Sequence, residues 1–357
     1  MNKSSALNQP WIDSPSFDLL WILSPSWIAV ILVTLLPPQY RHNAEVPVVA
    51  WVVLILLIDV AHVYSTLFRT YFNAVRFKAD REFLIFTPIA CYVGGVLVYS
   101  IDGTVFWRCI AYLAVFHFIR QQYGFMKLYS RGEQQPSVFK KIDVLTIYSV
   151  TIYPIVFWHF SGDRLFSWFL EGDFYIAPIP EIRDTAFLFY LFIILLYLVK
   201  ETYSILTQKF INIPRNLVVI STGVSWYMGI VYFNADLIFT LLNVVAHGIP
   251  YMALVWTTSK KENNNLNKNE RYRVFFSRYG VLAFLAVLFL FAWIEEGLWD
   301  GMVWRERRTV FPAFSRLPEL KSSYLLAFVV PLLSLPQITH YILDGFIWKR
   351  KKSLHTK

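Results

Sequence analysis

The sequence predicts an all-α protein, a polytopic integral membrane helical bundle with about ten transmembrane helices that forms a single domain over residues 1–357. Of these residues, 56% are hydrophobic and only 16% are charged, whereas charged residues make up about 25% of a typical soluble domain. The mean hydropathy is +0.46, which excludes a disordered chain. The apolar residues form continuous runs, and such runs favour membrane-spanning helices over the alternating strands of a barrel.

Each predicted helix is an apolar run close to the roughly 20 residues that cross about 30 Å of hydrocarbon. The ten runs are 17–37, 46–68, 83–100, 104–125, 142–160, 186–199, 215–233, 237–259, 278–294 and 324–348. The sixth run is short unless it continues toward residue 210, and prolines interrupt the first and the fifth. Pro250 and Pro336 indicate kinks in the eighth and tenth helices. The first run lacks a small-residue cleavage site, so we expect it to be retained as a span.

The basic residues predict how these helices are oriented in the membrane. Ten spans place both termini on one side, together with 23 of the 33 Lys and Arg residues, and leave Arg120 alone inside a span. The positive-inside rule then predicts cytoplasmic termini, and we expect the protein in a cell membrane, such as a cell inner membrane. The formal charge of +9 is thus assigned to orientation and to contact with anionic membrane lipids, not to nucleic acid. Residues 260–277 are a predicted cytoplasmic polar loop, and residues 349–357 a basic cytoplasmic tail.

Four of the seven His residues, His62, His117, His247 and His340, lie inside predicted spans. These spans run in the same direction, and each His lies 10 to 16 residues from the outer end, which is about 15–24 Å at 1.5 Å per residue. The four residues therefore form one layer near the membrane midplane. A single His in a span is often a hydrogen-bonded packing residue. Four at one depth favour a shared metal site, because ionisable groups in a span are costly unless they pair or bind an ion.

Each of these His residues has polar companions about one helical turn away, where i,i+3 and i,i+4 side chains meet. A ligating His commonly donates its second N–H to a carboxylate, amide or carbonyl group. The candidate orienting residues are Asp59, Asn243 and Asp344. Arg120, Gln121 and Tyr251 are the candidate catalytic residues, and we expect Arg120 with Gln121 to bind a polar substrate end or an oxygen-derived anion. A structural charge network of Arg120 with the two aspartates is the alternative interpretation.

The ligand set indicates which metal to expect. Four neutral imidazoles without a thiolate suit a first-row metal such as iron, copper or zinc. The chain has five Met residues, and only Met252 lies near a proposed ligand, which disfavours copper(I). Zinc hydrolysis normally uses three protein ligands and an open position for water. Iron(II) held by His in an apolar cavity suits the activation of O₂ against a lipophilic substrate, so we expect Fe²⁺.

The closing segment resembles a motif of a known family. Residues 336–348 read PQITHYILDGFIW, and this order of His340, aliphatic residues, Asp344 and aromatic residues is similar to the last motif of the Brp/Blh-type β-carotene dioxygenases. The segments around His117 and His247 are similar to the second and third motifs of that family. The resemblance implies an integral membrane protein that cleaves a carotenoid-like substrate at non-haem iron held by four His residues.

The chain also departs from that family pattern. Asp59 precedes His62, whereas the family has the Asp after the His, and the second nearby His of the family's third motif is missing after His247. Arg120, Gln121 and Gln122 stand where the family has small residues and an Asp. The predicted ten spans also exceed the number in the family.

Together these patterns predict a membrane-embedded metalloenzyme, a non-haem iron oxygenase acting on a lipid or isoprenoid substrate. We expect membrane lipids, a lipophilic small molecule and an electron-donor protein as its partners. One alternative is a haem-binding membrane electron carrier with axial His ligands. A second is a proton- or ion-coupled transporter that uses the buried His, Asp and Arg residues. A third is an acyl or glycosyl transferase that uses Asn243 and His247.

Overall fold

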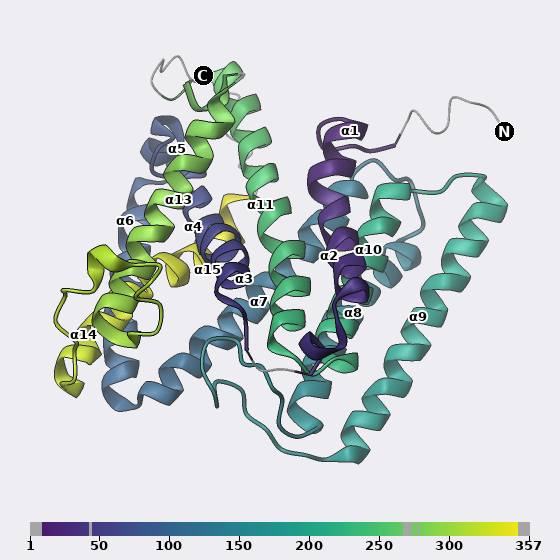
Figure 1. Ribbon diagram of the computed structural model, residues 1–357. Coiled ribbons are helices and arrows are strands. Elements are labelled where there is room, and N and C mark those ends of the chain that lie inside the picture. Colours follow the sequence, from purple (N-terminus) through teal and green to yellow (C-terminus); the bar gives the residue numbers. More distant parts are fainter. Residues whose placement is uncertain (1–8, 43–44, 267–271, 273, 278, 349–357) are drawn as a thin grey trace. The chain divides into compact units, whose positions relative to one another are not determined.

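The computed structural model describes residues 9–42, 45–266, 272, 274–277 and 279–348 (Figure 1). Within these ranges the secondary structure consists of helices, with no strand. The predicted all-α class is therefore confirmed. The predicted basic tail, residues 349–357, lies outside the described residues, as do residues 267–271, 273 and 278 in and beside the predicted polar loop.

Several helices are long and apolar enough to cross a membrane, as a multi-pass membrane protein requires. Among the described residues they are Pro15–Leu35, Val48–Arg69, Arg81–Ile101, Ser137–Phe160, Pro180–Thr207, Asp236–Asn263 and Gly280–Trp304. An eighth span results if α14 (Ser323–Leu333) and α15 (Leu335–Ile347), bent by 41°, cross together. The predicted count of about ten is not confirmed. Helices α7 (Gly103–Tyr129) and α10 (Ile213–Trp226) cover the predicted fourth and seventh spans but are not among the candidates.

Three helices differ in extent from the predicted spans. Helix α9 (Pro180–Gln208) has 29 residues where the sequence indicates a short run. Pro180 occupies its first turn, where a backbone N–H group has no partner within the helix, so a proline is tolerated there. Helix α11 (Asp236–Leu266) continues through Pro250 and seven residues past position 259. Helix α13 (Gly280–Trp299) continues into the π-helix η6 (Asp300–Trp304). The segment around Glu295, which lies beyond the end of the predicted run 278–294, is therefore helical.

The chain divides into two compact units. The first comprises Met1–Ala50 and Phe118–Pro250, and the second Trp51–His117 and Tyr251–Lys357. The remaining elements of the first unit are α1 (Pro15–Asp18), η1 (Leu19–Leu23), α2 (Ser24–Leu35), η2 (Pro38–Tyr40), α8 (Ser137–Phe160) and η4 (Tyr227–Tyr232). In this unit α8 packs against α9, α10 and η4, and α10 packs against α2 (Figure 1).

The second unit builds its core around α4 and α13. The division between the units falls within α3 (Val48–Trp51), and the remaining elements of the second unit are η3 (Val52–Val60), α4 (Ala61–Arg69), α5 (Ala74–Ala79), α6 (Arg81–Ile101), η5 (Val274–Phe276) and η7 (Pro312–Phe314). Helix α13 packs against η3 and α4, while α15 packs against α4 and α6. The buried core includes Val60, Ala61, Phe68, Val255 and Leu288. Tyr272 closes this core: its hydroxyl donates to the carbonyl of Phe68, and burial raises its pKa to about 12.

Gly280 begins α13 at a point where a side chain has no room. A Cβ atom at this position would overlap the backbone of Val274 and Phe275. We expect Gly280→Ala to reduce the free energy of unfolding by about 1–3 kcal/mol through overpacking, which is measurable as a lower Tm in detergent. Gly345→Ala on α15 is the matched control, because nothing lies within 4 Å of a Cβ there. Equal Tm values for the two variants would contradict this packing.

The first unit buries a network of charges. Lys200 Nζ is 2.7 Å from Asp143 Oδ1 and 2.5 Å from Glu201 Oε1. Arg215 Nη1 is 2.8 Å from Glu133 Oε2, and its Nη2 is 2.5 Å from Glu201 Oε1. Lys200 and Arg215 are each only 3% exposed. These two cations, which lie at the end of the predicted run 186–199 and at the start of the run 215–233, therefore neutralise buried carboxylates.

Removing Lys200 is expected to destabilise the first unit strongly. Lys200→Met leaves the carboxylates of Asp143 and Glu201 with one cation fewer, and breaking a buried ion pair from one side costs about 3–5 kcal/mol. We expect a lower midpoint of thermal unfolding in detergent. Lys141→Met removes the same charge from an exposed position on α8, and we expect its midpoint to stay close to that of the wild type. A Lys200→Met protein as stable as Lys141→Met would show that the network contributes little.

Candidate metal centre

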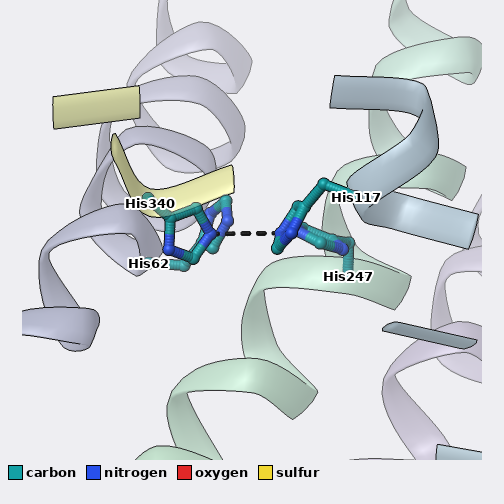
Figure 2. Close-up of side chains that lie close together, drawn as sticks. All are labelled: His62, His117, His247 and His340. Carbon is teal, nitrogen blue, oxygen red and sulfur yellow. Dashed lines mark hydrogen bonds between the residues drawn. The ribbon is translucent and has the colours of Figure 1, made fainter. Parts of the chain in front are cut away.

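The four His residues of the predicted layer lie together. His62 is on α4, His117 on α7, His247 on α11 and His340 on α15 (Figure 2). One ring nitrogen of each offers a ligand atom, and these four atoms all lie within 4.8 Å of one another. The four residues are 0–2% exposed. The structure thus brings together the residues that their common depth in the sequence predicts.

Three of the four imidazoles belong to the second unit and are in direct contact. The ring centroids of His117 and His340 are 4.5 Å apart, and those of His62 and His340 are 5.0 Å apart. The Nε2 atoms of His340 and His117 are 3.1 Å apart, and Figure 2 shows them facing each other. His62 follows the π-helix η3 by two residues, and such widened turns are frequent at functional sites.

The Asp344 carboxylate fixes the orientation of His117. Its Oδ1 atom accepts hydrogen bonds from Tyr251 Oη at 2.8 Å and from Trp348 Nε1 at 2.5 Å. Its Oδ2 atom lies 3.3 Å from His117 Nδ1. An ionised carboxylate acts as an acceptor only. His117 therefore carries its proton on Nδ1 and presents the lone pair of Nε2 to the cluster.

A chain of hydroxyl groups fixes His340 in the same way. Thr66 Oγ1 is 3.3 Å from Tyr251 Oη and 2.6 Å from His340 Nδ1. Because Tyr251 gives its only hydroxyl proton to Asp344, Thr66 must be the donor to Tyr251. The Thr66 oxygen then accepts from His340, which places the His340 proton on Nδ1. Both imidazoles thus direct an Nε2 lone pair toward the same point.

These two lone pairs repel each other unless a cation lies between them. First-row metals bind imidazole nitrogen at about 2.0–2.1 Å, so neighbouring ligands are about 3.0–3.4 Å apart and opposite ligands about 4.2 Å apart. The Nε2 separation of 3.1 Å suits neighbouring ligands. All four ligand atoms lie within 4.8 Å of one another, so small movements of the side chains would let all four bind a single ion. The donor set and its geometry therefore fit a metal of this class.

His247 is held by the part of α7 that follows His117. Its ring stacks on Phe118, with centroids 3.5 Å apart and planes inclined by 7°. Gln121 Nε2 donates to the His247 carbonyl at 2.9 Å, and Gln122 Nε2 donates to the Ala246 carbonyl at 3.4 Å. Gln121, a candidate catalytic residue, thus holds the backbone that carries His247. In this way α7 carries one imidazole of the group and positions the helix that carries another.

Asp344 and Tyr251 lie in the cluster, but Asp344 contacts a different His from the one its spacing predicts. The sequence pairs Asp344 with His340, one turn away on the same helix, whereas its carboxylate faces His117 on α7. Tyr251, a candidate catalytic residue, holds Asp344 and Thr66 through its hydroxyl group. These residues orient imidazoles across helices rather than along one helix.

The other three predicted site residues are Asp59, Asn243 and Arg120. Asp59 Oδ1 is 3.8 Å from His62 Nδ1, which is within reach of an ion pair but too long for a hydrogen bond. Asn243 is buried and donates to the carbonyl of Phe239 at 2.8 Å. Arg120 is exposed and donates from Nη1 to Tyr148 Oη at 2.5 Å. The expected roles of Asn243 and Arg120 therefore find no counterpart in these contacts.

Three residues of this region are not among the predicted site residues. Thr66 and Trp348 bind His340 and Asp344 directly. Each lies four positions after a predicted site residue, so the same helical spacing could have indicated them. Glu295 is buried and accepts a hydrogen bond from Tyr64 Oη at 2.6 Å. Tyr64 follows His62 by two residues, but only the fold brings Glu295 to it.

Comparison with protein-family models, with curated proteins and with solved structures gives no match. The resemblance to the Brp/Blh-type dioxygenases therefore stays a prediction from short motifs.

Proposed function

We propose that His62, His117, His247 and His340 bind one first-row transition metal ion, Fe²⁺ being the expected occupant. The observation that carries this proposal is the 3.1 Å separation of the Nε2 atoms of His117 and His340, which face each other. A single proton could bridge this pair alone. A metal ion also accounts for the ligand atoms of His62 and His247 within the same 4.8 Å.

The geometry favours a mononuclear ion over haem. A haem held by two His residues would keep their rings apart, because the macrocycle would lie between them. Here the His117 and His340 rings are in direct contact, with centroids 4.5 Å apart, so no macrocycle fits between these two rings. We therefore propose a non-haem site.

We further propose that the protein is a membrane oxidoreductase, an oxygenase acting on a lipid or isoprenoid, carotenoid-like substrate. Iron(II) with His ligands, when bound, supplies the redox chemistry that O₂ activation needs. The chain supplies the setting: Asp344 and Thr66 hold the imidazoles in the tautomer that can bind metal. Buried apolar side chains such as Val60 and Ala61, which directly precede His62 in the chain, limit the access of water. A substrate that arrives from the bilayer is consistent with this apolar surrounding.

Metal analysis with an oxygen-uptake assay tests this function. The full chain is purified in detergent, its metals are counted per chain, and O₂ consumption is followed after addition of β-carotene or another isoprenoid. We expect about one iron per chain and substrate-dependent O₂ uptake that His62→Ala abolishes. A folded protein that consumes O₂ but contains no metal would contradict the proposed metal site. A protein that contains iron but does not consume O₂ would contradict only the proposed oxygenase activity. A Soret band in the optical spectrum would contradict the non-haem site.

We also propose that both termini face the cytoplasm of the cell membrane, as the distribution of Lys and Arg indicates. A reporter fused after residue 357 that is active only in the cytoplasm tests this orientation. Activity of a reporter that requires the outer side would contradict it.

A further inference from the structure

A cavity of about 300 Å³ in the second unit combines a basic wall with an apolar wall. Arg69, at the end of α4, and Arg76, on α5, contribute the basic wall. Phe83, Phe346 and Ile347 contribute to the apolar wall. None of these residues is a proposed metal ligand, so the cavity is distinct from the His cluster.

The two arginines are held in place within the protein. Arg69 Nη1 and Arg76 Nη2 lie 2.9 Å and 2.7 Å from the same oxygen, Oε1 of Glu262. The Arg69 guanidinium stacks over the Trp348 ring at 4.7 Å. Arg69 is only 5% exposed, and its Nε atom has no hydrogen-bond partner among the described residues. The two guanidiniums carry five N–H groups each, so their capacity to donate exceeds what one carboxylate oxygen accepts.

The charge around the cavity favours an anion. Between residues 69 and 82 the chain carries four basic side chains, Arg69, Arg76, Lys78 and Arg81, and two acidic ones. With Glu262 included, the local balance is still positive. Guanidinium groups bind phosphate and carboxylate in a two-pronged geometry that Lys cannot provide. The cavity therefore offers paired donors for an oxyanion, with Asp80 as the one carboxylate in its lining.

The apolar wall indicates that this anion carries a hydrocarbon chain. Phe83 and Phe346 pair with ring centroids 4.9 Å apart, and they are 37% and 49% exposed. Basic pockets between membrane helices are typical binding sites for acidic lipid head groups. A volume of about 300 Å³ lies at the lower end of ligand pockets, which suits a head group and the first part of a chain.

We propose that this cavity binds the anionic head, phosphate or carboxylate, of an amphiphile, with Arg69 and Arg76 as donors and the chain on Phe83 and Phe346. The head belongs to a membrane phospholipid or to a free fatty acid, since both present the same chemistry. This proposal does not rest on the metal site, so it stands or falls on lipid binding alone.

Native mass spectrometry of the full chain in detergent tests the site. The protein is titrated separately with phosphatidic acid, oleic acid, phosphatidylcholine and inorganic phosphate. We expect one tight adduct with phosphatidic acid, with oleic acid, or with both. Binding of phosphatidic acid identifies a phospholipid as the source of the head, and binding of oleic acid identifies a free fatty acid. Inorganic phosphate should bind at least tenfold more weakly, because it does not use the apolar wall. Inorganic phosphate bound as tightly as the amphiphiles, or equal binding of phosphatidylcholine, would overturn the proposal.

Three variants assign the binding to this cavity. Arg76→Gln removes one donor while Arg69 keeps its ion pair, and we expect about tenfold weaker binding of the amphiphile. Lys78→Gln removes an exposed charge from the same helix α5 and should leave binding unchanged. Glu262→Gln removes the carboxylate that competes for both arginines, and we expect tighter binding. Equal affinities for Arg76→Gln and Lys78→Gln, in proteins with wild-type Tm, would overturn the assignment, as would weaker binding by a stable Glu262→Gln protein.

Discussion

His340→Ala leaves the purified protein with less than about a tenth of the wild-type iron content. The expectation follows from the position of His340 at the centre of the group, where its ring contacts both His62 and His117. Loss of a residue that only orients a ligand typically costs 10–100-fold in metal affinity, and the loss of a ligand should cost at least as much. Metal counted per chain after purification in detergent gives the result directly.

The control for this prediction is His159→Ala. His159 lies on α8 and its Nδ1 atom contacts the Tyr175 carbonyl, so we expect its loss to leave the iron content unchanged. A second measurement separates loss of metal from loss of fold. A ligand present at 100 times its Kd stabilises the folded state by about 2.7 kcal/mol, so a chelator should lower the Tm of the wild type. It should not change the Tm of His340→Ala. Equal iron in both variants would contradict the site.

The fold class and the composition of the cluster could be predicted from the sequence because each depends on a property of single helices. Continuous apolar runs indicate helices in lipid whatever their neighbours are. The common depth of His62, His117, His247 and His340 follows from counting along each run. Neither inference needs to know which helix packs against which.

The pairing between helices could not be predicted in this way. Spacing along one helix indicates that Asp344 is near His340, but its carboxylate faces His117 on another helix. The same limit applies to Lys200, whose partner Asp143 lies 57 positions away in the chain. A basic residue after an apolar run is typical of a loop, and only packing shows that this one is buried.

The predicted count of about ten spans is not confirmed, and the polar contacts of α7 show one reason. Helix α7 includes the polar stretch from His117 to Gln122, where Gln121 and Gln122 bond to the backbone of α11. Side chains that serve such contacts lower the apolar content of the helix. Length and hydropathy therefore do not count α7 among the candidate spans, although they do count the helix that carries His247.

Asp344→Asn is expected to lower metal affinity by about 10–100-fold without unfolding the protein. An Asn side chain has one carbonyl oxygen, which can still accept from Tyr251 and Trp348. Its NH₂ group then faces His117 Nδ1, so that two donors point at each other. His117 relieves this conflict by moving its proton to Nε2, the atom that faces His340 Nε2 at 3.1 Å. The proton then occupies the direction along which the metal must bind.

Tyr251→Phe provides the graded comparison for this prediction. It removes the hydroxyl group between Asp344 and Thr66 but leaves the carboxylate at His117 and the contact of Thr66 with His340. We expect a loss of affinity below about tenfold, because neither imidazole is forced into the other tautomer. Competition with a chelator of known affinity measures both variants. If Asp344→Asn bound metal as tightly as Tyr251→Phe, the Asp344 carboxylate would not set the His117 tautomer. This result would contradict the inference that His117 and His340 direct their Nε2 lone pairs toward each other.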